Sequence, residues 1–283
     1  MNSSKIYLRS LTTVRELQAM NELEKIIWGM DSTIPYHQTI TAVKNGGLIL
    51  GAYLDNELVG FQYSFAGFDG KMSYLCSHML GVHPKYQHLG IGKMLKLMQK
   101  EEALKMGYRL ITWTFDPLES VNGYFNIRKL GAVGKKYIEN CYEQMEDNLN
   151  TGLPSDRLLA EWWITSTHVE KRENNNLQHL LPDKSNQTAY WAVNEKGLPI
   201  VKEIILSNHE LPEYLFVPIP INIQEIKKID FPLALDWRLK TRQILNYYFQ
   251  RNWFIIDFWK ETDKNKPINY YILSSGKGGG DKL

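Results

Sequence analysis

Two glycines separated by one residue lie where an apolar, strand-like segment meets a strong helix pattern. The segment "LGVHPKYQHLGIGKMLKLMQKEEALKMGY" runs from Leu80 to Tyr108 and contains both glycines. Glycine is a poor helix former, so its use here indicates a special turn or the close approach of another molecule to the backbone. The first N–H groups of a helix have no partner within it, and with the helix dipole they suit an anion such as a pyrophosphate. The residues that carry these groups are Gly90, Ile91, Gly92 and Lys93.

The spacing excludes two common phosphate-binding loops. A Walker loop needs a glycine five residues before Gly92 and a Ser or Thr after Lys93, where the chain has Gln87 and Met94. The dinucleotide fingerprint needs a third glycine where the chain has Leu95. A Gln-x-x-Gly-x-Gly pattern at a strand–helix junction remains, and a purely structural glycine turn is its alternative. Nearby on the helix, Lys93 and Lys96 are candidates to assist a phosphate.

Strand and helix patterns alternate around this junction through residue 167. Apolar residues at helical spacing predict helices over 13–28 and from Gly90 to Met106, and a short helix over 120–131. Period-two and apolar runs predict strands at 5–11, 46–54, 57–68, 71–84, 108–118, 132–143 and 157–166. Asp55-Asn56 is a hairpin signal between two of these strands. The interleaved order predicts a mixed α/β fold, with a β-sheet flanked by helices.

A polar stretch at residues 170–187 separates this half from a second set of strands and a helix. We therefore predict a domain at 1–167, a C-terminal α/β extension at 185–275 and a flexible tail at 276–283. The extension repeats the strand–helix–strand order of the first half without its glycine loop. It is either a degenerate second copy or a continuation of the sheet.

The composition fits an ordinary folded chain of 283 residues, with 43% hydrophobic and 23% charged residues. A net charge of +2 gives no support for a nucleic-acid partner. No apolar stretch approaches the length of a membrane span, and the first residues lack the apolar core of a signal peptide. With only two cysteines, we expect a cytoplasmic protein without disulfides.

"LGVHPKYQHLGIGKML" resembles motif A of the GNAT superfamily of acyl-CoA N-acyltransferases, in which such a glycine loop holds the pyrophosphate of coenzyme A. Leu80, Val82 and Pro84 match the lead-in of that motif, and the order of elements in residues 5–167 is also similar. "ITWTFDPLES" followed by "YFNIRKLGA" resembles a bacterial subgroup with an added C-terminal region. The resemblance implies a twisted GNAT-like mixed sheet, acetyl-CoA or another acyl-CoA as co-substrate, and an amine acceptor. The residues that it implies for acyl-CoA binding are Leu80, Gly81, Val82, Gln87, His88, Leu89, Gly90, Ile91, Gly92 and Lys93.

The resemblance also implies catalytic candidates, because acyl transfer to an amine needs a base, an oxyanion donor and a proton for the leaving thiolate. His78 lies where relatives often carry a Glu, and it is a candidate base; a hydrogen-bonded core histidine is the alternative. Asp116 is a second candidate base or a turn residue. Relatives often place a catalytic Tyr where this chain has Ile127, so Tyr124, one turn earlier, is the candidate acid or else a packing residue.

Four further residues are candidates for binding. Asn122 and Asn126 could bond the pantetheine or adenosine part of the cofactor, or cap a helix. Arg238 and Arg242 lie four residues apart on one predicted helix face and could hold a carboxylate of an amino acid acceptor or of a succinyl group. Surface ion pairing is the alternative for both arginines.

The resulting hypothesis is a CoA-dependent N-acyltransferase, with an acetyl or larger acyl group and a small-molecule amine, plausibly an amino acid. A non-catalytic CoA-binding or sensory protein and a protein N-acetyltransferase are the alternatives. Three histidines, His78, His83 and His88, recur near Cys76 but run from a strand into a loop, so they cannot share one face and no metal site is predicted.

Overall fold

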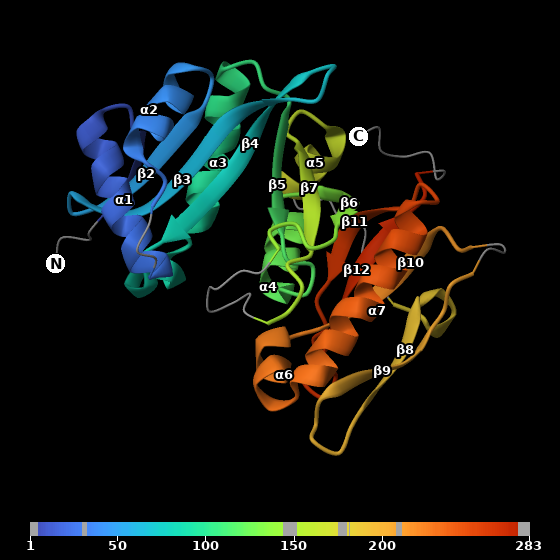
Figure 1. Cartoon of the computed structure of the whole chain (residues 1–283). Coiled ribbons are helices and arrows are strands. Elements are labelled where there is room, and N and C mark those ends of the chain that lie inside the picture. Colours follow the sequence, from blue (N-terminus) through green and yellow to red (C-terminus); the bar gives the residue numbers. More distant parts are fainter. Residues whose placement is uncertain are drawn as a thin grey trace. The chain divides into compact units, whose positions relative to one another are not determined.

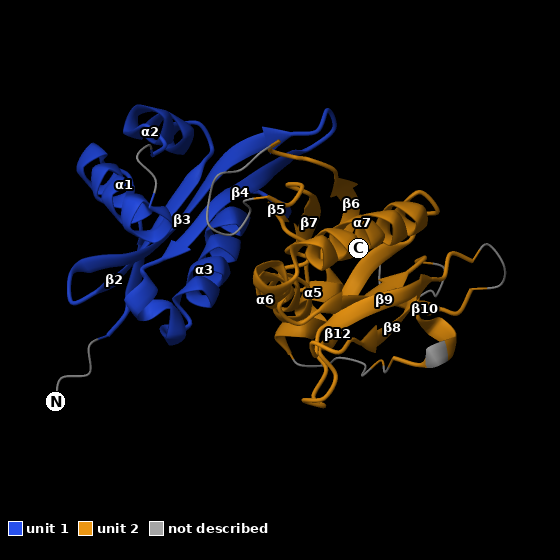
Figure 2. Cartoon of the chain, turned by 60° about the horizontal axis from the view of Figure 1, so that its bottom comes forward, with its two compact units in different colours: residues 1–113 blue, residues 114–283 orange. Residues whose placement is uncertain are grey.

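The computed structural model describes residues 5–29, 33–143, 152–174, 180, 182–207 and 211–276. The chain forms two compact units, residues 1–113 and 114–283 (Figure 2). This division differs from the domain boundaries expected at 167 and 185, which stay a prediction, and the expected tail falls almost entirely outside the described residues.

Unit 1 is a five-stranded part of a sheet with helices on both faces (Figure 1). Its elements are β1 (Tyr7–Ser10), α1 (Val14–Trp28), α2 (Tyr36–Lys44), β2 (Leu48–Leu54), β3 (Glu57–Phe68), β4 (Ser73–Val82), the 3₁₀ helix η1 (Pro84–Leu89), α3 (Ile91–Lys105) and β5 (Leu110–Phe115), whose last two residues pass into unit 2. The strands follow the order β1-β2-β3-β4-β5. Neighbours are antiparallel up to β4, and β4 and β5 are parallel.

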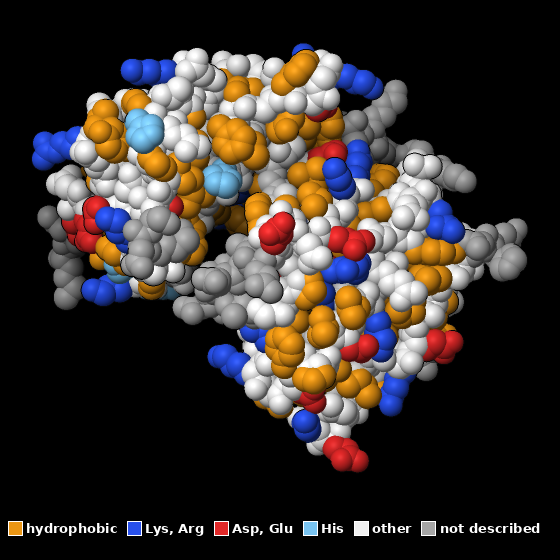
Figure 3. Space-filling view, in the orientation of Figure 1, with side chains coloured by type: hydrophobic (Ala, Val, Ile, Leu, Met, Phe, Trp, Pro, Cys, Tyr) orange, Lys and Arg blue, Asp and Glu red, His pale blue; other side chains and the backbone are white. Residues whose placement is uncertain are grey.

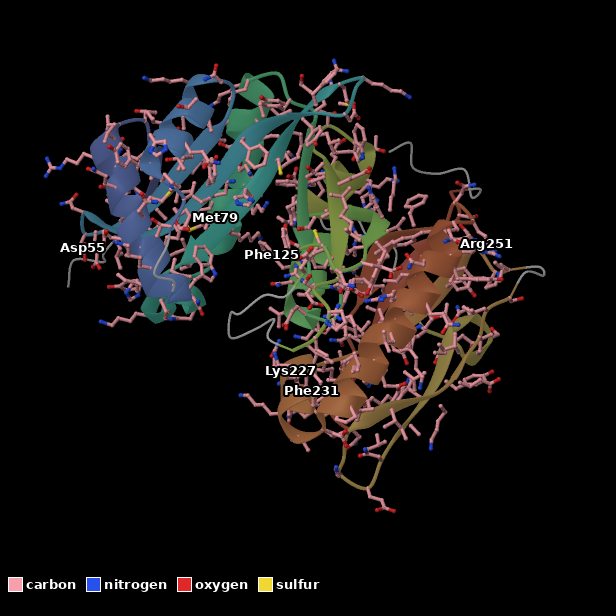
Figure 4. All side chains as sticks on the ribbon, in the orientation of Figure 1. Asp55, Met79, Phe125, Lys227, Phe231 and Arg251 are labelled. Carbon is pink, nitrogen blue, oxygen red and sulfur yellow. The ribbon has the colours of Figure 1, made fainter. Side chains whose placement is uncertain are left out.

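Local sequence accounts for the ends of these elements. Thr13 and Glu16 form a capping box that begins α1. Asp55 and Asn56 adopt positive φ angles of 49° and 68°, the conformation that a two-residue hairpin needs; Asp55 is labelled at this turn in Figure 4. Gly107, with a φ of 87°, follows α3 as a left-handed helix stop.

Alternation along the central strands places α1 and α3 on opposite faces. A Cβ atom on Gly60 of β3 would meet Ile91 of α3, whereas one on Gly81 of β4 would meet Ile27 and Trp28 of α1. Gly81 pairs with Phe61, the neighbour of Gly60, so the two directions are opposite. The α1 face carries a buried core of Leu11, Leu17, Met20, Leu23, Ile49, Tyr53, Phe61 and Tyr63.

Unit 2 contains a second antiparallel part of the sheet and a separate hairpin. Its elements are α4 (Ser120–Gly123), the π-helix η2 (Tyr124–Lys129), β6 (Val133–Ile138), β7 (Arg157–Trp163), α5 (Thr167–Glu173), the 3₁₀ helix η3 (Lys184–Asn186), β8 (Ala189–Val193), β9 (Pro199–Ile204), β10 (Tyr214–Pro220), α6 (Ile223–Ile229), α7 (Phe231–Phe249), β11 (Phe254–Trp259) and β12 (Ile268–Ser274). The strand order is β7-β6-β11-β12-β10, and β8 pairs only with β9 among the described strands.

The C-terminal strands therefore join the same sheet as β6 and β7, through the pair Ile255 and Gly134. Whether the extension is also a degenerate second copy stays a prediction. Helix α7 buries one stripe of residues at helical spacing, and the Trp237 indole donates to the Pro199 carbonyl at 2.8 Å. The stripe consists of Ala234, Trp237, Arg238, Thr241, Ile244, Leu245 and Tyr248.

The mixed α/β class, the hairpin and the helix after the glycine loop are confirmed. Helices α2, α5 and α6 were not predicted, and the segment expected as a short helix is α-helical only to Gly123 and π-helical afterwards. None of the described helices is long and apolar enough to cross a bilayer. On the face shown in Figure 3, acidic and basic side chains are interspersed with hydrophobic ones, as expected for a net charge of +2.

Candidate functional site

The glycine loop connects the end of β4 to the start of α3. Gln87, His88 and Leu89 are exposed at the end of η1, and Lys93 is exposed in the first turn of α3. Among the hydrogen bonds of the described residues, the N–H groups of Gly90, Ile91 and Gly92 have no acceptor, whereas the Lys93 N–H donates to the Gly90 carbonyl at 3.1 Å. Three of the four N–H groups expected to be available are therefore open to a ligand. The fourth, on Lys93, is already bonded.

Glycine occurs at positions 90 and 92 for different reasons. Gly90 has a φ of 72°, so its backbone conformation alone favours glycine. Gly92 is helical, and a Cβ atom there would meet only Leu80 Cδ2, at 3.8 Å. Internal packing therefore does not require glycine at position 92, and the space beside its backbone is open to a ligand.

Strand β4 carries a β-bulge in its pairing with β3, just after the point where its pairing with β5 ends. Tyr63 pairs with Met79 and Ser64 pairs with Ser77, so His78 is an extra residue. Met79, labelled in Figure 4, lies on β4 next to the bulge. The β4–β5 ladder consists of Leu75 with Ile111 and Cys76 with Thr112. Within the part of unit 1 that the structure describes, β4 has no ladder partner on its β5 side from the bulge onward.

The peptide groups of β4 beyond the bulge can be assigned a direction. The His83 N–H donates to the Val59 carbonyl at 2.8 Å, so it faces β3. Peptide groups alternate between the two sides of an antiparallel strand. Leu80 and Val82 therefore direct their N–H and carbonyl groups away from β3, whereas Gly81 directs its groups toward it. The Gln87 amide donates to the outward Val82 carbonyl at 3.3 Å.

His78 lies in an aromatic environment on the bulge. Its ring centroid is 5.9 Å from that of Tyr63 and 5.8 Å from that of Phe65. The side chain is exposed, but desolvation beside these rings lowers the pKa of His78 below its ordinary value. A histidine with a lowered pKa is neutral near pH 7 and can accept a proton.

Lys96 is the residue in which the structure departs most from expectation. Its side chain is 2% exposed, so it does not assist a phosphate at the surface, and that expectation was wrong. Its Nζ donates to Ser77 Oγ at 2.8 Å and lies 3.6 Å from the centroid of the Trp113 ring. Desolvation lowers the pKa of Lys96 to about 7. In the sequence, only its position one turn after Gly92, on the same helix face, distinguished it from the other lysines of α3.

A polar network surrounds Lys96 between α3 and the sheet. The Gln62 amide donates to Ser77 Oγ at 3.3 Å and also to Ser64 Oγ, and the Gln99 amide donates to Ser64 Oγ at 2.6 Å. Both glutamine oxygens are buried, and neither has a hydrogen-bond partner among the described residues. The network is therefore not closed on itself.

Comparison with known proteins identifies the family to which the glycine loop and its flanking elements belong. The sequence model of the acetyltransferase (GNAT) family matches residues 15–129, which include β4, the glycine loop and α3. This part of the chain is a GNAT-family acetyltransferase domain. No curated protein matches the chain. The bacterial subgroup suggested by "ITWTFDPLES" stays a prediction.

Several solved structures are similar to the GNAT domain. The ribosomal-protein-S18-alanine N-acetyltransferase from Escherichia coli is 16% identical over 56% of this chain and 94% of its own, with a TM-score of 0.46. Naa50 from Arabidopsis thaliana, in complex with a bisubstrate analogue, is 18% identical over 55% of this chain and 97% of its own, with a TM-score of 0.44. A GNAT family acetyltransferase from Elizabethkingia anophelis with acetyl-CoA bound is 16% identical over 57% and 99%, with a TM-score of 0.40.

The GNAT domain continues into unit 2, where four further candidates lie. Asp116 follows β5, and its carboxylate accepts the Leu118 N–H at 2.8 Å, as its alternative role as a turn residue requires. Asn122 is exposed and Asn126 is buried. Tyr124 is half-buried at the start of the π-helix, with its ring 6.1 Å from that of Phe258.

The π-helix changes the interpretation of Tyr124. In an α-helix, Tyr124 and Ile127 would cover neighbouring parts of one face. The wider turn of a π-helix separates residues three apart, and Ile127 is fully buried whereas Tyr124 is partly exposed. The structure thus gives Tyr124 a different direction from the residue that matches the family tyrosine.

Both candidate substrate arginines of the extension have acidic partners. Arg238 is 1% exposed and forms an ion pair with Asp116. Arg242 binds the Asp156 carboxylate through two nitrogens, at 2.8 and 2.9 Å, and lies 3.1 Å from Glu139. Surface ion pairing was the stated alternative, but the Arg238 pair is buried. A substrate role for either arginine requires these pairs to break, and it stays a prediction.

No group of His, Cys, Asp and Glu side chains in the described residues is arranged to hold a metal ion.

Proposed function

We propose that the chain is a CoA-dependent N-acyltransferase that transfers an acetyl or larger acyl group to the amine of a small molecule. The observation that carries this proposal is the set of open N–H groups on Gly90, Ile91 and Gly92 in a GNAT-family domain. They suit the pyrophosphate of coenzyme A because the helix dipole and the N–H groups act together on an anion.

The rest of the cofactor would follow the open edge of β4. The outward peptide groups of Leu80 and Val82 would bond the pantetheine amides and the thioester carbonyl in place of the missing β5 ladder. Around the pyrophosphate, Gln87, His88 and Leu89 would line the loop. Lys93 would add a positive charge there, since its side chain is exposed.

The transfer step forms one bond and breaks one. The neutral amine attacks the thioester carbon and a C–N bond forms; the C–S bond then breaks and the thiolate of coenzyme A leaves. The oxyanion of the intermediate would accept the Leu80 N–H. His78 would take the proton that the amine loses, directly or through a water molecule.

Candidates for the remaining roles lie in unit 2. Tyr124 would give a proton to the thiolate, although a thiol with a pKa of about 8.5 can also leave without help. Asp116 is the second candidate base, and Asn122 and Asn126 are candidates for contacts with the cofactor. We infer that the acceptor is a small amine of the amino acid class, and a protein amine is the alternative.

A thermal-shift titration with free CoA and acetyl-CoA tests the cofactor site, because a ligand bound only by the native state raises the melting temperature. Thiol release from acetyl-CoA with mixed amines then separates an enzyme from a CoA-binding protein. A melting temperature unchanged by either ligand would reject the proposal. Binding without thiol release would favour the non-catalytic alternative.

A further inference from the structure

Lys96 occupies the point at which β4 and β5 separate. The last pair of their ladder is Cys76 with Thr112, and the next residue on each strand is Ser77 and Trp113. The Lys96 Nζ contacts both of these residues, at 2.8 Å from Ser77 Oγ and 3.6 Å from the Trp113 ring centroid. The side chain therefore reaches from α3 to the base of the opening between the strands.

The charge of Lys96 has no carboxylate partner among the described residues, and the Cys76 thiol is a titratable group that interacts with it electrostatically. Within the part of the chain that the structure describes, no carboxylate lies within ion-pair distance of its Nζ. Buried lysines are normally paired, because an isolated charge is strongly unfavourable in the interior. The candidate arginines Arg238 and Arg242, in contrast, each hold a carboxylate.

Hydrogen-bond donors remain available at the same point. An ammonium group carries three donors, and the Lys96 Nζ uses one of them on Ser77. The Ser77 hydroxyl accepts from Lys96 and Gln62, so its own proton can be donated. This donor set suits a carboxylate.

We infer that Lys96 selects acyl-CoA molecules whose acyl chain ends in a carboxylate, such as succinyl-CoA. The inference rests on the proposed function, which places the thioester on the open edge of β4 near Leu80. An acyl chain longer than acetyl, directed back along β4, approaches Ser77 and Lys96 at the base of the opening. There the carboxylate would pair with the Nζ and accept the Ser77 hydroxyl. Lys96 is then a specificity-determining residue.

The inference predicts that Lys96 takes up a proton when the carboxylate binds. Desolvation lowers the pKa of Lys96 to about 7, so at pH 8 most of the amine is neutral. A bound carboxylate favours the ammonium form, and the complex then takes up about one proton at pH 8. A neutral acyl chain of the same length gives no such uptake at Lys96.

Calorimetric titration of the full chain with succinyl-CoA, butyryl-CoA and free CoA tests the inference. Butyryl is the neutral match of succinyl, because both have four carbons. We expect succinyl-CoA to bind at least tenfold more tightly than butyryl-CoA to the unmodified protein. In Lys96→Met this preference falls to twofold or less, while butyryl-CoA affinity changes less than threefold. A preference that is absent in the unmodified protein, or that is the same in Lys96→Met, overturns the inference.

The unmodified protein provides a second readout, which does not depend on the folding of a variant. Titrations at pH 8 in two buffers of different ionisation enthalpy report proton uptake. Uptake of about one proton with succinyl-CoA and of much less with butyryl-CoA supports the inference, whereas equal uptake overturns it. If free CoA and butyryl-CoA bind but succinyl-CoA shows neither tighter binding nor greater proton uptake, the inference is rejected and the proposed function is not. If none of the three ligands binds, the proposed function itself fails, and the inference fails with it.

Discussion

Gly90 and Gly92 differ in what would follow from adding a side chain. The φ of 72° at Gly90 is unfavourable for other residues, so a substitution there would affect folding and binding together. At Gly92 the backbone is helical, and the nearest atom to a new Cβ atom is Leu80 Cδ2 at 3.8 Å. A substitution at position 92 therefore tests ligand binding with little effect on folding.

Replacing Gly92 with Val is expected to weaken the binding of free CoA by roughly tenfold or more, because the side chain would fill the space for the pyrophosphate. The free energy of unfolding should change by less than about 1 kcal/mol, the range of helix propensities. Calorimetry with CoA and urea unfolding measure the two quantities. Glu101→Val, at an exposed position of the same helix, is the control and should retain CoA affinity. Equal CoA affinity in the two variants would contradict the loop assignment.

A base at His78 predicts a particular pH dependence. The pKa of His78 lies below its ordinary value of 6.5, so the imidazole stays neutral at pH 6.5. The value of kcat/KM should therefore fall only below about pH 6.5, where the base becomes protonated. His78→Gln should remove this acidic limb and lower kcat, while the Kd for CoA stays the same. Initial rates of thiol release from pH 5 to 8 provide the measurement. If kcat and the acidic limb of the pH profile are both unchanged in His78→Gln, His78 is not the base, and Asp116 remains the candidate.

The sequence predicted the glycine loop but not the environment of Lys96. Position along the chain and helix period were enough for Gly90 and Gly92, because an anion site at a helix start depends only on local structure. The burial of Lys96 depends on contacts of α3 with Ser77 of β4 and Trp113 of β5. Its neighbours are distant in sequence, so a scattered series of lysines gave no indication of it.

At the scale of elements, β4 is the strand that shapes the site. The bulge at His78 interrupts the ladder, and the pairing with β5 stops at Cys76 and Thr112. Bulges commonly end pairing and redirect side chains next to functional sites. The end of the β5 ladder leaves the peptide groups of Leu80 and Val82 without strand partners, and the bulge makes His78 the extra residue of the strand.

Strand and helix patterns predicted the large elements, but the bulge and the π-helix were not visible. The hairpin at Asp55-Asn56 and the capping box of α1 are local signals, and both are confirmed. The bulge arises from the register in which β3 pairs with β4, and the residue pattern of one strand does not determine that register. Helix α2 begins after Pro35 without a side-chain cap, so it lacked the usual start signal.

The packing of Lys96 between α3 and the sheet predicts a pH-dependent stability. Its pKa is about 7 in the folded chain and 10.5 as its ordinary value, so the unfolded chain binds more protons between these values. Stability should therefore rise by roughly 5 kcal/mol in all as the pH passes from below 7 to above 10.5, at about 1.4 kcal/mol per pKa unit, and by roughly 3 kcal/mol between pH 7 and 9.5. Urea unfolding of the unmodified protein and of Lys96→Met at pH 7 and 9.5 measures this contribution.

The rise should be clearly smaller in Lys96→Met, which carries no titrating group at this position. Lys100→Met, one turn further along α3 at a less buried site, serves as the control and should keep the rise. The same pH dependence in all three proteins would show that Lys96 stays charged in the fold.

At the scale of the molecule, the extension and the end of the GNAT domain share one interior in unit 2. The Tyr271 hydroxyl donates to the Pro117 carbonyl at 2.8 Å, and the Asn269 amide donates to Ser120 Oγ at 2.6 Å. Asp257 accepts from both Arg128 and Arg172. Residues before 130 thus depend on residues after 250 for their buried polar partners, which the separate domains expected from the sequence did not suggest.

The ion pair between Asp116 and Arg238 is another link with little exposure, because the Arg238 side chain is 1% exposed and that of Asp116 is 14% exposed. Arg238→Met would leave the Asp116 carboxylate without its cation, and loss of one partner of a buried pair destabilises by about 3–5 kcal/mol. Lys240→Met on the same helix removes a half-exposed ion pair with Asp236 and a hydrogen bond to the Val201 carbonyl, and it should change stability by only about 1 kcal/mol. Urea unfolding measures both variants, and Asp116→Leu combined with Arg238→Met should recover part of the loss, because no unpaired charge is then buried. If Arg238→Met is as mild as Lys240→Met, the pair does not stabilise the fold, and Arg238 is free to serve as the carboxylate ligand that its position four residues from Arg242 suggested.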